Sequence, residues 1–535
     1  MVRDALAESL RDALAALGVS PVPAEVHLER PARREHGDWS SNVALAASKA
    51  AGRKPRDLAQ ELADHLTAAL PPHVESVEVA GPGFVNFRLR PTWLHDVLRD
   101  VVEQGTDTFA RPDLGHGRKV NVEFVSANPT GPVHAGHARG ATYGDALARL
   151  LERCGHDVHR EFYINDRGVQ MDAFAQSLAA RRSGGEPPEN GYHGQYIIDW
   201  AAEMPEGVDH VAWGYQKALD DQREVLGRLG VEYDTWFSER SLVESGAIEE
   251  TLADLRAHGV VYDADGATWL RSTDYGDDKD RVLVKSDGEL TYLTPDIAYH
   301  REKFARGAEQ LIDVWGADHH GYVARMRAAL QALGHAPSDF EAAITQMVRL
   351  ERHGVEVKIS KRTGDLIELR DLLDEVGRDA VRLTYLLQSI DTRQTVDLDL
   401  ITSKSMDNPV FYVQYAHARI HSIEKVARER EVTRVPLADV DLGLLVHERE
   451  LDVLRALSDL PDVVELACNE RAPHKITTWV RELAGAFHGF YHDCYVMGEG
   501  VSAELTQARL ALVEASRVGL AIGLDLLGVS APESM

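Results

Sequence analysis

Two histidines, His134 and His137, flank Gly136 in the stretch "SANPTGPVHAGH", which also contains two prolines. A glycine at this position would let a flat ring or a phosphate approach the backbone where a Cβ atom would obstruct it. A helix beginning near His137 would present unpaired N–H groups and a positive dipole end to an anion. Imidazoles at that end can hydrogen-bond phosphate oxygens and stabilise charge that develops at phosphorus. The stretch therefore favours a nucleotide site.

Two other interpretations of this stretch stay open. Histidines three positions apart can cap the start of a helix while one imidazole is buried, and a lone H-x-x-H can be half of a metal site. A metal site is disfavoured, because neither an H-E-x-x-H pattern nor a cysteine pair accompanies the histidines. Taken alone, the pattern does not decide between a structural turn and phosphate chemistry.

The stretch "EVKISKRTGD" is a second candidate site, in which Lys358 and Lys361 flank Ile359 and Ser360. Lysine is a compact charge on a flexible stem, which suits it to a polyphosphate whose charge moves during a reaction. A solvated basic turn is the simpler interpretation of this stretch by itself.

The sequence around the histidines predicts a strand, a tight turn and a helix. Val120, Val122 and Phe124 lie on one face of the expected strand, and helical spacing runs over residues 138–154. This order opens a βαβ unit and a parallel sheet. Further strands are expected at "DVHREFYIND", "GELTYLTP" and "EQLIDVWGAD", so the expected fold is α/β, with a Rossmann-like, doubly wound parallel sheet.

The rest of the chain is expected to form three more parts. Residues 1–110 combine two amphipathic helices with a hairpin at "VESVEVAGPGFVNFRLR", as in a small α/β domain. The sheet domain spans 111–370, with a helical insertion at about 185–270 that follows a Gly/Pro-rich break. Helices at 371–404 lead to an all-α bundle at 405–535.

Composition sets outer limits on the function. A chain of 535 residues predicts several domains, and no apolar run reaches the roughly 18 residues that a membrane span needs. The N-terminus is unlike a secretory signal, so we expect a cytoplasmic protein. A net charge of −28 argues against indiscriminate nucleic-acid binding and leaves room for local basic patches. Cys154, Cys468 and Cys494 stand far apart and are expected to be reduced thiols.

The two motifs together resemble the paired signatures of class I aminoacyl-tRNA synthetases. Three longer stretches, beginning at "VEFVSANPTG", "VKISKRTGD" and "DNPVFYVQYAH", look like arginyl-tRNA synthetases, and so do "REHGDWSSNVALAASK" and "GPGFVNFRL". The resemblance spans nearly the whole chain. It implies attack of the arginine carboxylate on the α-phosphate of ATP, then transfer to the 3′-terminal ribose of tRNA(Arg).

The resemblance also implies cofactors and partners. ATP is a substrate and enters with Mg²⁺, and no protein-bound metal or organic cofactor is expected. L-arginine and tRNA(Arg) are the other partners, the protein is a monomer without membrane contact, and activation of arginine waits for bound tRNA.

The resemblance places the reacting groups residue by residue. It implies that His134, His137, Lys358 and Lys361 are catalytic. The ATP site would comprise these four residues together with Pro132, Gly136, Val348 and Ser360.

Arginine recognition has an independent physical requirement. A guanidinium carries five N–H donors in a fixed fork, which calls for carboxylates and tyrosine hydroxyls. The resemblance implies that Asp296 pairs with the guanidinium, that Glu123 faces the α-amino group and that Asn128 assists at the carboxylate end. The implied arginine site comprises Glu123, Ser126, Asn128, His137, Tyr292, Asp296 and Asp318. Glu123 as a surface charge and Tyr292 as a packed aromatic are the simpler alternatives.

Five residues are expected to contact tRNA. "GFVNF" is similar to the family segment at the outer corner of the tRNA, which makes Phe84 and Asn86 candidates. "YVQYAHARI" is similar to the anticodon-binding face, where Tyr415 could stack on a base and Arg419 reach a phosphate. The C-terminal Met535 completes the set. Core packing is the alternative for Tyr412 and Tyr415, whose spacing also suits a helix stripe.

Three rival functions remain. A nucleotidyltransferase making a small metabolite would not need the large helical domain at 405–535. A non-catalytic tRNA-binding relative would be expected to lose motif residues, and His134, His137, Lys358 and Lys361 are all present. A class I synthetase for another amino acid is the third rival; the missing cysteine zinc ligands disfavour the cysteine enzyme, and no long editing insertion is evident.

Overall fold

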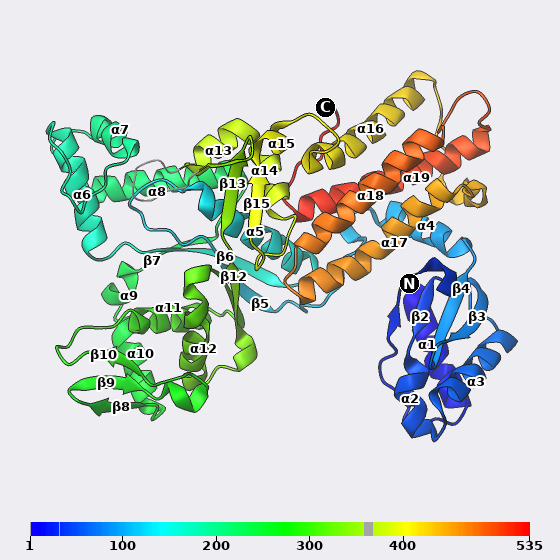
Figure 1. Ribbon diagram of the computed structural model, residues 1–535, viewed down its shortest axis with the longest axis horizontal. Helices are drawn as coiled ribbons and strands as arrows, with labels where there is room; N and C mark the ends of the chain where they lie inside the picture. The colour runs from blue at the N-terminus through cyan, green and yellow to red at the C-terminus, as the bar shows by residue number, and fades with distance from the viewer. Residues whose placement is uncertain (1, 32, 358–366) are drawn as a thin grey trace. The chain divides into compact units, whose positions relative to one another are not determined.

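The computed structural model describes residues 2–31, 33–357 and 367–535 (Figure 1). The chain forms two compact units. The first comprises Met1–Gly105, Ala427–Ser458 and Gly489–Ser516, and the second comprises Thr106–Val426, Asp459–His488 and Arg517–Met535. Among the described residues, no helix combines the length and apolar character that crossing a membrane requires.

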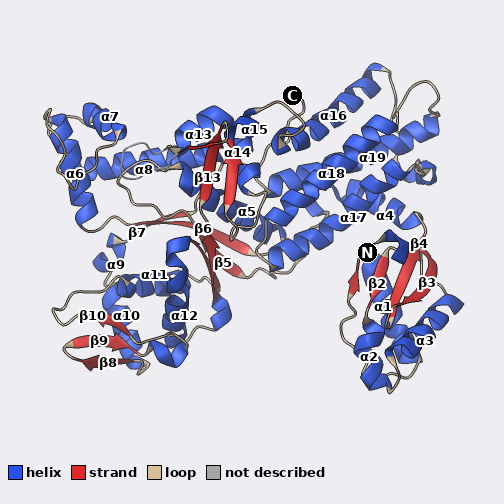
Figure 2. Cartoon of the chain, in the orientation of Figure 1, coloured by secondary structure: helices blue, strands red, loops and turns tan. Residues whose placement is uncertain are grey.

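The N-terminal part of the first unit is a four-stranded antiparallel sheet in the order β1-β2-β4-β3, with helices packed on it (Figure 2). The hairpin expected at "VESVEVAGPGFVNFRLR" is confirmed, because β3 and β4 pair across Gly81 and Gly83. The elements are α1 (Val2–Ala16), β1 (Leu28–Glu29), η1 (Arg34–His36), β2 (Trp39–Ser41), α2 (Val43–Ala51), α3 (Pro55–Ala68), β3 (Val74–Ala80), β4 (Phe84–Leu89) and α4 (Thr92–Thr108).

The second unit is built on the expected parallel sheet, whose five strands follow the order β12-β11-β5-β6-β7. The chain moves outward from β5 through β6 to β7 on one side and continues with β11 and β12 on the other. Ligands of such sheets bind beyond the carboxyl ends of the strands, at the point where the order reverses. The strands are β5 (Lys119–Glu123), β6 (Asp157–Ile164), β7 (Thr235–Ser238), β11 (Gln310–Gly316) and β12 (Phe340–Thr345).

Three helices connect or cover these strands. The helix expected at 138–154 is confirmed as α5, and the apolar side chains of α11 and α12 share a core with Leu311 and Phe340 from the sheet. The elements are η2 (Ala135–His137), α5 (Ala138–Arg153), α11 (Leu293–Ala305), η4 (Ala317–Tyr322), α12 (Val323–Ala332) and η5 (Pro337–Asp339).

The span expected as a helical insertion contains helices and also strands. Its β7 completes the parallel sheet, and β8, β9 and β10 form a separate antiparallel sheet. The strand expected at "GELTYLTP" is wrong: Leu290 forms one isolated bridge with Val284, and the residues from Leu293 onward begin a helix. The elements are α6 (Val169–Arg182), α7 (Gln195–Glu203), α8 (His210–Leu229), α9 (Arg240–Glu244), α10 (Ala247–Ala257), β8 (Val261–Ala264), β9 (Ala267–Leu270), η3 (Ser272–Tyr275) and β10 (Arg281–Val284).

A third small sheet follows β12, in the order β14-β13-β15. The segment 371–404 was expected to be helical throughout, yet it contains β15, which pairs in parallel with β13. Only burial alternates over these four positions, and one of the two buried residues, Gln394, is polar, so the sequence carried no strand pattern. The elements are β13 (Val348–Arg352), β14 (Val355–Val357), α13 (Leu369–Val376), α14 (Arg378–Tyr385), β15 (Gln394–Asp397) and α15 (Leu398–Thr402).

The C-terminal region is helical, as the sequence predicted. Each of the four long helices contributes residues to both units. The three cysteines are buried thiols. The elements are α16 (Pro409–Glu429), η6 (Leu437–Asp439), η7 (Leu442–Leu444), α17 (Glu448–Asn469), α18 (His474–Asp493) and α19 (Ala503–Leu526).

Candidate active site

The chain leaves β5 through two residues in the left-handed region. Val125 has a φ of 75° and Ser126 a φ of 46°. A β-branched residue avoids this region, and holding one there costs about 1–3 kcal/mol. Such strain is typical of functional sites, and here it lies directly beyond the carboxyl end of β5. Neither residue is a glycine, so the sequence offered no signal for this kink.

Side chains from the insertion hold the turn that follows. The fully buried Gln222 of α8 donates through Nε2 to the carbonyls of Asn128 and Gly131, both at 3.0 Å. The hydroxyl of Tyr196 on α7 donates to the carbonyl of Thr130 at 3.0 Å. A Cβ atom at Gly131 would lie 2.9 Å from that hydroxyl oxygen, so this close approach requires glycine. Sequence reasoning missed Gln222 and Tyr196, because no motif links them to a turn so distant in the chain.

The H-x-G-H stretch forms a capped helix start. Gly136 N–H donates to Nδ1 of His134 at 3.1 Å, and His134 N–H donates to Nδ1 of His137 at 3.4 Å. The two imidazole rings lie 3.7 Å apart between centroids. Because Nδ1 accepts in both rings, the neutral imidazoles carry their protons on Nε2, the atom that can donate to a phosphate oxygen. Capping and phosphate binding therefore use different ring nitrogens, and the structural interpretation does not exclude the chemical one.

The chain on both sides of residues 358–366 contacts this region. Val357, at the end of β14, lines the cavity described below. The N–H of Ala135 donates to the carbonyl of Ile367 at 2.9 Å, and His134 forms a β-bridge with Glu368. Lys358, Ser360 and Lys361, which were expected at the ATP site, lie outside the described residues.

A cavity of about 650 Å³ lies at the carboxyl ends of β11 and β12. Five residues expected in the site line it together, and they are His134, Gly136, His137, Asp318 and Val348. Met347, which the sequence did not single out, also lines it with an exposed side chain. Pro132 is half-buried in the turn and is not among the described residues that line the cavity. The cavity combines two imidazoles and a helix start with apolar walls, as a nucleotide requires.

A second group of acidic and phenolic side chains comes from β6, α11 and the segments that follow β7 and β11. Asp296 of α11 accepts a hydrogen bond from the Tyr322 hydroxyl at 2.5 Å. Burial raises the pKa of Asp296, and this hydrogen bond opposes the rise only in part. Burial also raises the pKa of Glu239, which follows β7 and lies close enough to Asp296 for mutual repulsion. Tyr163, from β6, interacts with Glu239. Sequence reasoning identified Asp296 and missed Glu239, Tyr163 and Tyr322.

A network of paired charges lies beneath these side chains. Lys303 is fully buried and contacts Glu123 at 2.5 Å and Asp313 at 2.9 Å. Although burial lowers the pKa of Lys303, the surrounding carboxylates outweigh it and raise the pKa above its ordinary value. The other carboxylate oxygen of Glu123 accepts from Ser126 Oγ at 2.8 Å. Glu123 is only 6% exposed, which rules out the alternative of a surface charge.

The remaining arginine-site candidates lie further apart. The Asn128 side chain donates to Gln170 at 2.6 Å. Tyr292 is 91% exposed immediately before α11, so it is not a packed aromatic. The Asp318 side chain is exposed at the cavity and lies 3.6 Å from His319. Among the described residues, no group of three or more His, Cys, Asp or Glu side chains has an arrangement that could hold a metal ion.

Two tRNA candidates lie on β4 in the first unit. Asn86 is 7% exposed, and its side-chain oxygen accepts from Ser40 Oγ at 2.7 Å. Phe84 begins the strand and is half-buried.

The other tRNA candidates are on α16 and at the C-terminus, in the second unit. Tyr415 is half-buried between the Phe411 ring, at 5.4 Å, and the Arg419 guanidinium, at 4.3 Å. Arg419 is also bound to His488 at 2.9 Å. Tyr412 and Tyr415 keep exposed area, so neither is a core residue. Met535 is exposed and lines a cavity of about 410 Å³ that also includes Lys404 and Arg378.

Three family models match consecutive parts of this chain. The model described as the arginyl tRNA synthetase N terminal domain matches residues 4–89. The catalytic domain of class I (R) tRNA synthetases matches 99–185 and 220–399, and the DALR anticodon binding domain matches 413–535.

Full-length relatives and a solved structure are also similar. The chain is 48% identical over 532 residues to an arginine–tRNA ligase of Frankia alni, covering 96% of this chain and 95% of that protein. It is 45% identical over 557 residues to an arginine–tRNA ligase of Geobacillus thermodenitrificans, covering 100% and 99%. The structure of Thermus thermophilus arginyl-tRNA synthetase matches with a TM-score of 0.76 at 25% identity, over 100% of both chains.

Proposed function

Because this chain belongs to the arginyl-tRNA synthetase family, we propose that the two groups of side chains beside β5 hold the two reactants of its first step. The enzyme ligates L-arginine to tRNA(Arg) with ATP through an arginyl-adenylate, and it releases AMP and pyrophosphate. The arginine carboxylate attacks the α-phosphate as pyrophosphate leaves. A hydroxyl of the terminal ribose of tRNA then takes the arginyl group from AMP.

The 650 Å³ cavity is the proposed ATP site. Nε2–H of His134 and of His137 would donate to phosphate oxygens, and Gly136 would admit the phosphates to the backbone. Val348 would contact the adenine, while Pro132 would keep the turn rigid. Lys358, Ser360 and Lys361 would bind the departing pyrophosphate. Since attack and departure are in line, holding both reactants in position supplies much of the rate.

Asp296 and Glu239 are the proposed partners of the substrate guanidinium. The observation that carries this assignment is a contrast in counter-ions. The buried carboxylates beneath, Glu123, Asp313 and Glu161, pair with Lys303 or Arg306, whereas the side chain hydrogen-bonded to Asp296 is the neutral Tyr322. Glu239 is intermediate, because Arg167 lies 3.4 Å from its carboxylate while burial still raises its pKa. A buried carboxylate with a raised pKa is stabilised when a cation binds it. Tyr322 would orient the Asp296 carboxylate, and Tyr163 the carboxylate of Glu239.

The backbone end of arginine would lie between these two sites. Ser126 is bound to Glu123, so Glu123 would act on the α-amino group through the Ser126 hydroxyl as well as by its charge. Asn128 would assist at the carboxylate after leaving Gln170, and His137 would donate to it from the cavity side. Asp318 would lie on the same side, where its carboxylate could accept from the α-amino group. Tyr292 would fold over the bound substrate from its exposed position.

We assign tRNA binding to residues 1–110 and 405–535, and the chemistry to 111–370, with the insertion at about 185–270. Helices within 371–404 would contact a stem of the tRNA or link the domains. Tyr415 and Arg419 would bind an unpaired base and a phosphate, with Met535 nearby. Phe84 would pack on the outer corner of the tRNA, and Asn86 would have to release Ser40 to read a base there. The enzyme is proposed to act as a cytoplasmic monomer, with no membrane contact, on ATP that carries Mg²⁺ on its phosphates.

A charging assay tests the substrate. Purified enzyme, ATP and total tRNA are incubated in turn with each of the twenty labelled amino acids. Arginine alone should be retained on tRNA, and stable charging with a different amino acid would refute the assignment.

Isotope exchange between pyrophosphate and ATP tests the order of events. The expected result is arginine-dependent exchange only when tRNA(Arg) is present. Exchange at the full rate without tRNA would show that activation does not wait for it.

A further inference from the structure

Arg139 is a buried cation with an unusual set of partners. It is 1% exposed and is the second residue of α5, two positions after His137. Its Nη1 donates to the carbonyl of Gln346 at 3.0 Å and its Nη2 to the carbonyl of Ser389 at 2.7 Å. Burying a guanidinium against neutral carbonyls is costly, and here burial lowers its pKa. The two donor nitrogens of a rigid guanidinium are suited to holding two connecting segments against one helix.

One of the two carbonyls belongs to a segment that lines the 650 Å³ cavity, and the other belongs to a segment hydrogen-bonded to it. Gln346 connects β12 to β13 and lines the cavity beside Met347 and Val348. Its N–H donates to the carbonyl of Ile390 at 3.0 Å, and the parallel pairing of β13 with β15 continues from Val348. Arg139 therefore joins α5, the β12–β13 connection and the α14–β15 connection at one point.

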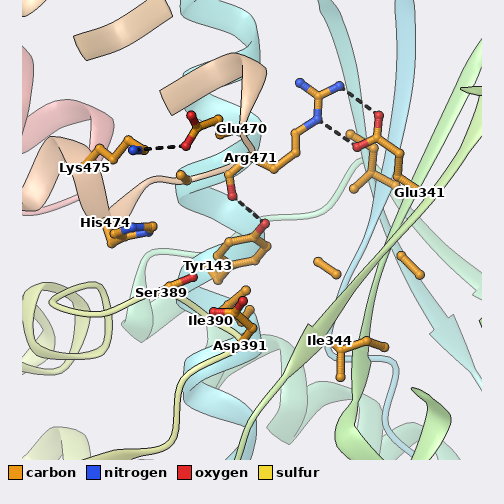
Figure 3. A pocket seen from close by; sticks show the side chains of 14 residues that line it. Tyr143, Glu341, Ile344, Ser389, Ile390, Asp391, Glu470, Arg471, His474 and Lys475 are labelled. Carbon is orange, nitrogen blue, oxygen red and sulfur yellow. Dashed lines mark hydrogen bonds and ion pairs between the residues drawn. The ribbon is translucent and has the colours of Figure 1, made fainter. Parts of the chain in front are cut away.

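Core packing does not replace this link on the side of Ser389. Ser389, Ile390 and Asp391 line a cavity of about 500 Å³, together with Tyr143 of α5 (Figure 3). Tyr143 follows Arg139 by one helical turn, and its hydroxyl donates to the carbonyl of Arg471 at 2.9 Å. An empty space adjoins Ser389, so the Arg139 hydrogen bond is a direct link between this residue and α5, while the bond between Gln346 and Ile390 ties the same connection to the start of β13.

We propose that Arg139 is a positioning residue that sets the spacing between the two halves of the ATP site. His137 is carried by α5 on the phosphate side, and Val348 is carried by β13 on the adenine side. The proposal rests on the assignment of this cavity to ATP. Asp296 and Glu239 belong to other segments, so the guanidinium pocket does not depend on Arg139.

Arg153 provides a matched control at the other end of the same helix. It is 8% exposed, and its guanidinium donates to three backbone carbonyls, those of Thr106 at 3.0 Å, Ala110 at 3.2 Å and Phe109. Burial lowers its pKa as well. It therefore shares the chemistry of Arg139 without contacting the ATP cavity.

The test compares Arg139→Lys with Arg153→Lys in steady-state tRNA charging, with ATP and arginine varied separately. Lysine keeps the charge but offers its donors from a single nitrogen, so it lacks the fixed fork whose two nitrogens reach the two carbonyls. We expect Arg139→Lys to raise the KM for ATP about tenfold and to leave the KM for arginine within about twofold. Arg153→Lys should leave both KM values within about twofold, although it should lower Tm about as much as Arg139→Lys does. Equal changes in both KM values for Arg139→Lys, or the same pattern in the two variants, would overturn the proposal.

Chemical rescue gives a second readout. The 500 Å³ cavity reaches Ser389, so a small cation can approach the space left by Arg139→Ala. Millimolar guanidinium should lower the raised KM for ATP of this variant, whereas ammonium should not. Folded Arg139→Ala protein that responds equally to both cations would contradict the proposal, and if the variant does not fold, Arg139→Lys carries the test.

His137→Asn separates this proposal from the assignment of the ATP site. If the cavity does not bind ATP, His137→Asn will leave the kinetics in ATP unchanged. If the cavity binds ATP but Arg139 has no positioning role, His137→Asn will be defective while Arg139→Lys behaves like Arg153→Lys.

Discussion

The proposed ATP side and the proposed arginine side of the active site are built in different ways. The ATP side comes mainly from two short stretches, the turn around His137 and the strand around Val348. In the turn, the capped helix start and Gly136 shape the site through the backbone. The arginine side gathers single side chains from β6, the end of β7, α11 and the end of η4. Short motifs are therefore informative for the nucleotide, whereas part of the proposed amino-acid pocket, Glu239, Tyr163 and Tyr322, emerges only from the three-dimensional arrangement.

The electrostatics of the two sides differ as well. Imidazoles and a helix start offer hydrogen-bond donors to an anion. On the arginine side, burial raises the pKa values of Asp296 and Glu239, which a bound guanidinium would reverse. If this contrast is correct, variants on one side should change the apparent affinity for one substrate only.

Asp296→Asn should have the largest effect. It removes the charge that faces the guanidinium, and losing one partner of a buried charge pair costs about 3 kcal/mol. The KM for arginine should therefore rise roughly 100-fold while the KM for ATP changes little. Steady-state charging with each substrate varied separately measures both values.

Glu302→Gln is the control for this variant. Glu302 lies on the same helix and pairs with Arg306 at 2.7 Å, away from Asp296. It should leave both KM values unchanged. A parallel rise in the KM for ATP in Asp296→Asn would break the separation between the two sides.

Gly136→Ala should affect the other substrate. The added Cβ would lie 2.9 Å from Nδ1 of His134, so the ring must move and the capping hydrogen bond weakens. A shift of a catalytic group can lower the rate about 10-fold or more, and we expect this loss in kcat/KM for ATP. The KM for arginine should stay near that of the unmodified enzyme.

Gly227→Ala is the matched glycine substitution for this experiment. Gly227 lies inside α8, where a Cβ would meet nothing within 4 Å. Alanine there should raise Tm slightly and leave charging intact. An unaltered rate in Gly136→Ala would show that His134 is not held to a fixed position by this contact.

The arginine side should also respond to pH. The pKa values of Asp296 and Glu239 are raised from ordinary values of 3.8 and 4.5, so in the folded protein the two groups lose their protons at higher pH than in the unfolded chain. Their contribution to stability is full below the ordinary values and is lost as the pH rises through the raised ones. Arginine binds the ionised forms, so the increase in Tm that it produces should grow over the same window.

Thermal unfolding at a series of pH values, with and without arginine, measures this effect. Glu239→Gln removes one of the two groups, which should flatten the pH dependence and raise the KM for arginine about 10-fold. An arginine-induced increase in Tm that is constant from pH 4 to 7 would contradict the assignment of both carboxylates.

Local patterns predicted much of this arrangement. Hydrophobic periodicity and the turn-forming glycines and prolines predicted the strand that ends at Glu123, the helix after His137 and the C-terminal helices. The left-handed Val125, the supports Gln222 and Tyr196 and the partner Tyr322 did not, because each depends on contacts between segments far apart in the chain. Resemblance identified Asp296 but not its partner, since a tyrosine without a motif carries no signal of its role. The residues from Lys358 to Lys361 were identified by sequence alone and lie outside the described residues.

Tyr322→Phe should give the smallest effect and is the sharpest probe of the arginine side. It removes only the hydroxyl that donates to Asp296 at 2.5 Å and keeps the ring in place. The loss of one such hydrogen bond is worth about 1 kcal/mol, which predicts a rise in the KM for arginine of roughly fivefold. The same change raises the pKa of Asp296 further, because the hydrogen bond had favoured its ionised form. The pH dependence of arginine binding should therefore move to higher pH, a displacement that simple loosening of the pocket would not produce.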